Sequence, residues 1–153
     1  MAKVVSINIS TEKGVVKKPV EEAVLQKEHG VVGDAHAGDW HRQVSLLAEE
    51  SIDKMRVSGV TLTPGVFAEN ITTRGLTLCT LPIGTQLQIG EAVLSVTQIG
   101  KECHMGCEIR RIVGDCVMPR EGIFAVVVKE GTVRPEDEIQ VIGGGADEEN
   151  RHQ

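Results

Sequence analysis

The chain has 153 residues, 41% apolar and 25% charged, which indicates one soluble globular domain with enough length for a hydrophobic core. Its net charge is −6 and aromatic residues make up 2%, so the basic patch and the stacking faces that nucleic acids require are not expected. We see neither a long apolar run nor a secretory signal, and therefore expect no membrane span and a cytoplasmic protein.

Alternating or β-branched segments predict strands along most of the chain. In chain order these are Lys3–Ile9, Val20–Lys27, Gln43–Leu47, Glu69–Thr73, Gln86–Ile89, Ala92–Gln98, Ile123–Lys129 and Glu138–Ile142. The turn Gly90-Glu91 joins the fifth and sixth of these strands in a predicted hairpin.

Helices are predicted at only two places. The segment 48–57 has acidic residues early and basic residues late, which suits the helix dipole. A second short helix is predicted within 105–113. Few helices, spaced strands and 17 glycines predict a mainly β fold, a closed or rolled β-barrel over residues 1–142. Residues 143–153 are Gly-rich and then polar, and predict a flexible tail.

The strongest chemical signal is a pair of thiols, Cys103 and Cys107, followed by Arg110 and Arg111. On a helix, residues four apart share a face, so the two thiols and Arg111 would align. Positive charge next to a thiol favours the thiolate, which binds soft metals and carries sulfur. We favour Cys107 as the active thiol and metal ligand, because the two arginines follow it at helical spacing. Cys103 remains the alternative.

Two other interpretations of the cysteines stay open. Free cysteine is among the most buried residue types, so both thiols can be core residues. Cys103, His104 and Cys107 can also be zinc ligands, although structural zinc sites prefer two-residue gaps between paired cysteines and a second pair of ligands. Cys79 and Cys116 are predicted to be structural, Cys79 as a core residue in a strand-like context.

Candidate anion-binding residues lie outside the cysteine segment. A glycine-rich loop, 33–38, carries Asp34 and His36, and its glycines would allow a ligand to approach the backbone. His36 is a candidate base or ligand, or else a hydrogen-bonded turn residue. Arg42 and Arg120 are candidate phosphate contacts, because a guanidinium matches phosphate geometry. The sequence contains no P-loop, no dinucleotide fingerprint and no nucleophile elbow.

Taken together, these segments resemble the MOSC domain, the module found at the C-terminal end of molybdenum cofactor sulfurase and as small bacterial proteins. The resemblance covers nearly all of residues 3–142 and rests on the order and spacing of several segments. They are 30–38, Arg42 to Leu46, Gly65 to Ile71 with Glu69 and Asn70, Leu81 to Gly84, Ile89 to Ala92, the cysteine segment, and Arg120 to Val126.

The resemblance implies a domain that binds the molybdenum cofactor or carries sulfur on a cysteine thiolate or persulfide. Arginines would anchor the pterin phosphate, and Glu69 and Asn70 would contact the pterin or backbone. It also implies a sulfur-donor or cofactor-biosynthesis partner. Pyridoxal phosphate would belong to a partner desulfurase, because no Schiff-base lysine stands out here. Two alternatives are a non-catalytic docking module and a zinc-stabilised β domain; whether the chain catalyses a reaction is left open.

Overall fold

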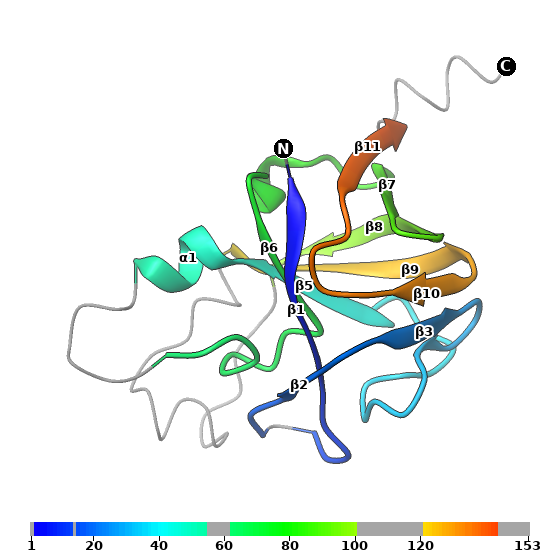
Figure 1. The fold of residues 1–153 in the computed structure, drawn as a ribbon. Coiled ribbons are helices and arrows are strands. Elements are labelled where there is room, and N and C mark those ends of the chain that lie inside the picture. Colours follow the sequence, from blue (N-terminus) through cyan, green and yellow to red (C-terminus); the bar gives the residue numbers. More distant parts are fainter. Residues whose placement is uncertain (1, 14, 55–61, 101–120, 144–153) are drawn as a thin grey trace, which may run out of the picture.

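The structure is a computed structural model that describes residues 2–13, 15–54, 62–100 and 121–143 (Figure 1). Within these ranges the protein is mainly β, with one short α-helix and one 3-10 turn. The strands are β1 (Lys3–Ile9), β2 (Lys18–Val20), β3 (Ala23–Gln26), β4 (Gly30–Val31), β5 (Val44–Ala48), β6 (Ile71–Arg74), β7 (Gln86–Ile89), β8 (Ala92–Ile99), β9 (Ile123–Lys129), β10 (Gly131–Val133) and β11 (Ile139–Gly143); α1 is Glu49–Asp53 and η1 is Leu78–Thr80.

Eight of the described strands form one sheet in the order β11-β7-β8-β9-β5-β6-β1-β2, and β10-β3-β4 form a second, three-stranded sheet. The described ladders are antiparallel except that between β5 and β6, which is parallel. Parallel neighbours need a crossover connection, and α1 lies at the start of the one that joins these two strands.

The large sheet curls so that β1 approaches the start of β11. The N–H of Val4 donates to Asp137 O at 2.8 Å, and the N–H of Ile139 donates to Ala2 O at 2.9 Å. A single bridge between Lys3 and Glu138 accompanies them. No ladder between described strands closes the sheet, so the mainly β prediction is confirmed and the closed barrel is not.

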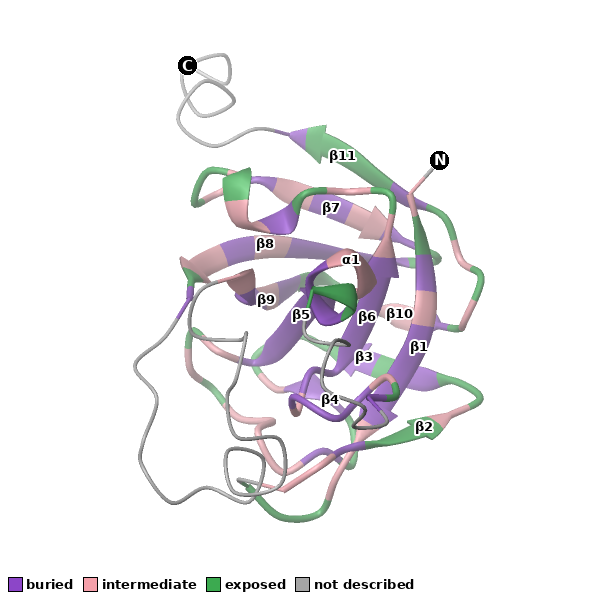
Figure 2. Ribbon diagram, turned by 90° about the vertical axis from the view of Figure 1, so that its left-hand side faces the viewer, coloured by how far each residue is buried: buried purple, intermediate pink, exposed green. Residues whose placement is uncertain are grey.

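The core follows from the alternation of the strands. The main cluster consists of buried side chains of both sheets, including residues of β1, β5, β7, β8 and β9. Buried positions along these strands are purple in Figure 2. A second cluster lies on the α1 side, and its members are Leu47, Ile52, Leu62, Val66, Phe67 and Phe124. Phe124 therefore holds the start of β9 from the face opposite the main core.

The predicted strands are found with small shifts. β1, β7 and β9 have the predicted bounds, and the predicted 90–91 turn joins β7 to β8. The predicted strand at 20–27 is divided into the end of β2 and β3. The predicted helix at 48–57 is found as α1, while 55–61, the second helix and the tail beyond Gly143 lie outside the described residues.

The interpretation of Cys79 as a core residue in a strand is wrong. Cys79 lies in the 3-10 turn η1 and is only half-buried. Successive residues of such a turn point about 120° apart, so Leu78 fills the core position while Cys79 turns away from it. No helix in the described residues is long and apolar enough to cross a membrane.

Candidate functional site

The structure brings some of the predicted site residues to one end of the large sheet. Asp34 and His36 lie in the connection from β4 to β5, and Arg42 lies just before β5. Glu69 and Asn70 lie just before β6. The remaining candidates lie outside the described residues, and their predicted roles stay predictions: Cys103, Cys107, Arg110, Arg111 and Arg120.

A buried ion pair organises this end. The Lys17 ammonium lies 2.7 Å from Asp34 Oδ1, and both side chains are 0% exposed. Asp34 Oδ1 also accepts the Ser10 N–H at 3.0 Å, and Asp34 Oδ2 accepts the His36 N–H at 3.0 Å. The carboxylate of Asp34 therefore joins the end of β1 to the loop that carries His36.

This environment holds Asp34 ionised. Burial alone would raise the pKa of its carboxyl group, but the hydrogen bond and positive charge of Lys17 and the hydrogen bond from the Ser10 N–H outweigh it. The pKa of Asp34 therefore lies well below its usual range. The Ser10 hydroxyl oxygen accepts from the Lys17 ammonium at 3.0 Å.

The sequence gives no local sign of this lysine. Lys17 and Lys18 look like a solvated pair at the start of an edge strand. Lys17 is buried by the pairing of β1 with β2, by Asp34 in loop 32–38 and by Gly65, and the last two contacts are remote in sequence.

The backbone of Lys17 is connected to Glu69 through the backbone groups of Gly65. The Lys17 N–H donates to Gly65 O at 2.9 Å, and the Gly65 N–H donates to Glu69 Oε2 at 2.9 Å. Glu69 also accepts from Phe67 N–H at 3.2 Å and from the Thr72 hydroxyl at 2.7 Å. Burial raises the pKa of the Glu69 carboxyl group, and these hydrogen bonds act against that rise.

Asn70 is fully buried in the same way. Its side-chain oxygen accepts the Ser45 N–H at 3.0 Å, and its amide group donates to Asn8 O at 3.1 Å. The polar atoms of Glu69 and Asn70 thus hold β1, β5 and β6 together in this structure. Their predicted contact with a pterin stays a prediction.

Arg42 has a different environment. Its guanidinium carbon lies 4.7 Å from the Trp40 ring centroid and 5.5 Å from that of Phe124. The Nε atom of Arg42 is buried and has no hydrogen-bond partner among the described residues. A buried, charged donor of this kind needs an acceptor. Lys13 lies on the same indole, 5.5 Å from its centroid, so two cationic side chains contact the Trp40 ring.

Arg42 lies where the cysteine-carrying segment leaves and re-enters the sheet. Gly100 and Gly122 bound that segment, and the Gly100 N–H donates to Gly122 O at 2.7 Å. Beside them, the His41 ring contacts Gln98 Oε1 at 2.8 Å, and the Thr97 hydroxyl donates to the His41 carbonyl oxygen. The residues next to Arg42 are thereby fixed to the end of β8.

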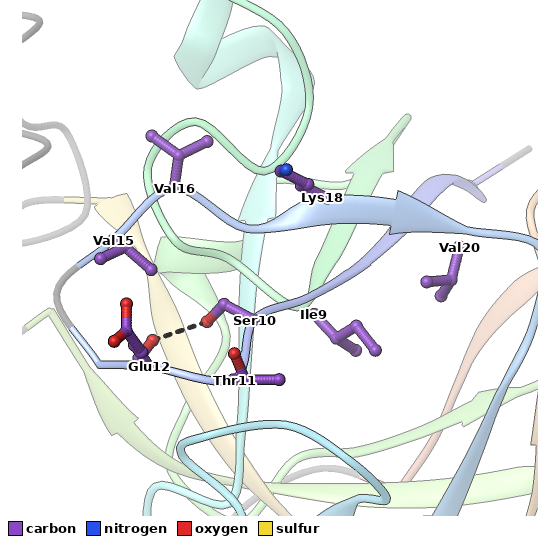
Figure 3. A pocket seen from close by; sticks show the side chains of 8 residues that line it. All are labelled: Ile9, Ser10, Thr11, Glu12, Val15, Val16, Lys18 and Val20. Carbon is purple, nitrogen blue, oxygen red and sulfur yellow. Dashed lines mark hydrogen bonds between the residues drawn. The ribbon is translucent and has the colours of Figure 1, made fainter.

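A cavity of about 390 Å³ opens between the end of β1 and the start of β2 (Figure 3). Its walls are largely aliphatic, with polar groups at one side; the lining residues are Ile9, Ser10, Thr11, Glu12, Val15, Val16, Lys18 and Val20. The Ser10 hydroxyl donates to Glu12 O at 2.8 Å and accepts from Lys17, so it joins the cavity wall to the buried ion pair.

Within the described ranges, His, Cys, Asp and Glu side chains do not gather in any group of three that could hold a metal ion. The zinc alternative involved Cys103, His104 and Cys107, all outside those ranges, and it stays a prediction.

The fold and this site define a class of small, mainly β domains with a polar, partly cationic end of the sheet. The chain belongs to the MOSC domain family, whose sequence profile it matches over residues 33–140. The predicted resemblance is thus confirmed. Among the curated proteins, none matches this sequence.

Solved structures share the fold. The YuaD protein of Bacillus subtilis superposes with a TM-score of 0.75 at 20% identity, covering 91% of this chain and 94% of its own. YiiM from Geobacillus stearothermophilus gives 0.69 at 20% identity, covering 93% of this chain and 75% of its own. YiiM from Escherichia coli gives 0.68 at 20% identity, with 94% and 70% covered. At these identities the likeness establishes the fold alone.

Proposed function

We propose that this protein is a MOSC domain that binds the molybdenum cofactor or carries sulfur on a cysteine thiolate. Cys107 is the favoured thiol and Cys103 its alternative. Arg42, with Arg110, Arg111 and Arg120, would anchor the anionic pterin phosphate. A sulfur-donor or cofactor-biosynthesis protein would be its partner, and any pyridoxal phosphate would belong to a desulfurase.

The observation that supports this proposal most is the environment of the Arg42 guanidinium group. Its Nε is buried without an acceptor among the described residues, and two aromatic rings hold the guanidinium plane. A phosphate oxygen is the acceptor that such a group fits, because guanidinium–phosphate hydrogen bonds are charge-assisted and planar.

The proposal puts the thiol and Arg42 in one site. It is supported by the described ends of the chain that flank the cysteine segment: the Gly100 N–H donates to Gly122 O at 2.7 Å, and His41, next to Arg42, contacts Gln98 near Gly100.

The chain's own chemistry in this proposal is simple. When bound, the molybdenum cofactor would supply the oxygen- or sulfur-transfer chemistry at its metal. As a sulfur carrier, the cysteine thiolate attacks the outer sulfur of a donor persulfide. The S–S bond of the donor breaks, the donor leaves as a thiolate, and the cysteine becomes a persulfide, without net oxidation. Arginine charge favours the thiolate that begins this exchange.

The test is to purify the protein from molybdate-fed cells and to measure molybdenum and oxidised pterin per chain. We expect both in the wild type and a loss of about ten- to a hundredfold in affinity in Arg42→Ala, because one charge-assisted hydrogen bond contributes about 1.5–3 kcal/mol. Arg134→Ala is the matched control, since Arg134 is an exposed arginine that pairs with Glu22. Wild-type protein without molybdenum, pterin or a persulfide would contradict the proposal.

A further inference from the structure

The Lys17 ammonium has three protons and contacts three acceptor atoms. Its Nζ lies 2.7 Å from Asp34 Oδ1, 3.0 Å from Ser10 Oγ and 3.0 Å from His36 Nδ1. The Ser10 hydroxyl donates a hydrogen bond to Glu12 O at 2.8 Å, so its oxygen is the acceptor toward Lys17. These contacts allow one assignment in which the ammonium donates to all three atoms.

This assignment fixes the tautomer of His36. Because Lys17 donates to Nδ1, that nitrogen offers its lone pair, and the single proton of the neutral ring lies on Nε2. The opposite tautomer would direct an Nδ1 proton toward an ammonium 3.0 Å away. Its other potential acceptor, Asp34 Oδ2, lies 3.8 Å from Nδ1, beyond hydrogen-bond distance.

The rest of the loop holds the ring in place. The His36 N–H donates to Asp34 Oδ2 at 3.0 Å, and the His36 carbonyl accepts from Trp40 Nε1 at 2.8 Å. The His36 side chain nevertheless remains 26% exposed, and its Nε2 makes no hydrogen bond to the described part of the chain. The His36 ring is therefore held by its neighbours while part of it stays accessible to solvent.

We propose that His36 is a neutral, Nε2-protonated hydrogen-bond donor for an oxyanion, and that Lys17 is the positioning residue that fixes this tautomer. In this state neither ring nitrogen has a free lone pair, so His36 is neither the base nor the metal ligand that its sequence context also allowed. The oxyanion is a phosphate group or a tetrahedral metal oxyanion such as molybdate, which offer similar acceptors. Trp40 links this donor to the second one, because its indole N–H contacts His36 while its ring stacks on Arg42.

The proposal shares its ligand class with the proposed function, but the tautomer itself does not depend on that function. The experiment is a long-range ¹H–¹⁵N correlation spectrum of the ¹⁵N-labelled full chain at pH 7.5. It distinguishes protonated from unprotonated ring nitrogens for each of the five histidines. The signals of His36 are those missing in His36→Gln.

We expect His36 to show a protonated Nε2 and an unprotonated Nδ1, and Lys17→Met to lose this pattern. If Lys17→Met does not fold, the double variant Lys17→Met/Asp34→Asn removes the other buried charge and gives the same readout. An Nδ1–H tautomer, a doubly protonated ring, or a pattern unchanged without Lys17 overturns the proposal.

Inorganic phosphate and molybdate are then titrated separately into the apoprotein. We expect a saturable shift of the His36 Nε2–H with at least one of them, and the difference between the two series identifies the preferred oxyanion. His36→Gln, which retains a donor at a similar position, should bind within about threefold of the wild type. His36→Phe should bind at least tenfold more weakly. Equal binding by His36→Phe, or no response to either anion, refutes the oxyanion role. A molybdenum-free native protein with these spectra would refute only the cofactor assignment.

Discussion

The buried pair of Lys17 and Asp34 gives the sharpest test of the structure. Both side chains are 0% exposed, and their closest atoms are 2.7 Å apart. Removing one partner leaves an uncompensated buried charge, which typically costs about 3–5 kcal/mol. We therefore expect Lys17→Met and Asp34→Asn each to lower the free energy of unfolding by that amount. This is a large share of the roughly 5–15 kcal/mol that a domain of this size possesses.

The double variant separates the pair from its surroundings. Lys17→Met/Asp34→Asn removes both charges, so it should lose clearly less than the sum of the two single variants, with a coupling of about 1–3 kcal/mol. The assay is urea unfolding at pH 7, monitored by far-UV circular dichroism. Tryptophan fluorescence is less suitable, because Trp40 is close to the site and reports local change. Arg134→Ala, which breaks an exposed pair, should cost less than about 1 kcal/mol. Single-variant losses below about 1 kcal/mol, or additive losses, would refute a buried and mutually dependent pair.

The same pair predicts an acid dependence. The folded protein holds the pKa of Asp34 well below its ordinary value of 3.8, so its contribution is present above that value and is lost as the pH falls below it. The wild type should therefore lose stability between about pH 4 and pH 2, and Asp34→Asn should lose less over the same window. Parallel curves for the two proteins would contradict this reasoning.

Glu69 should have the opposite pH dependence, because burial raises its pKa above 4.5 and the wild type should therefore lose stability as the pH rises from that value. In urea titrations, Glu69→Gln should flatten the plot of unfolding free energy against pH. An unchanged slope would count against a buried carboxylate with a raised pKa. Gly65 and Gly33 have similar positive φ angles, +92° and +90°. A Cβ at Gly65 would overlap the Lys17 carbonyl oxygen, whereas a Cβ at Gly33 would meet nothing within 4 Å. Gly65→Ala should therefore be about 1–3 kcal/mol less stable than Gly33→Ala, and equal losses would show that the loop can move aside. Cys107→Ser should abolish sulfur transfer or molybdenum retention without changing the unfolding midpoint; if Cys103→Ser does so instead, Cys103 is the active thiol. Arg120→Ala should weaken retention of the cofactor about ten- to a hundredfold, and unchanged retention in both Arg42→Ala and Arg120→Ala would place the phosphate on other donors.

The strands were predictable because their signal is local. Alternation in 3–9 and β-branched residues in 123–129 define their own strands, and the 90–91 turn defines a hairpin. β4 and β10 were not predicted, since each has only two or three residues and exists through pairing with β3. Sheet order likewise depends on pairing between segments that are far apart in sequence, and the bridge between Lys3 and Glu138 at the seam between β1 and β11 joins residues 135 positions apart.

The site was predictable in part for the same reason. Asp34, His36 and Arg42 were found because they lie in or beside a glycine-rich loop, where polar side chains often serve a ligand. Lys17 was missed because a lysine next to another lysine resembles a solvated surface. Trp40 and Phe124 were missed as the support of Arg42, because only β5 and β9 pairing brings Phe124 to that guanidinium.

The polar network explains why this end of the sheet has buried charges instead of a larger apolar core. The backbone N–H of Lys17 donates to Gly65 O and the Gly65 N–H donates to Glu69, so two buried carboxylates with opposite pKa shifts are linked through Lys17 and Gly65. Apolar residues of similar volume would often stabilise such a position by about 1–4 kcal/mol. They would, however, leave the His36 ring without a defined tautomer and the loops 32–38 and 62–69 without a fixed spacing. The buried polar groups thus fix the geometry of the loop that carries His36 and Trp40, beside Arg42, whose Nε has no hydrogen-bond partner among the described residues.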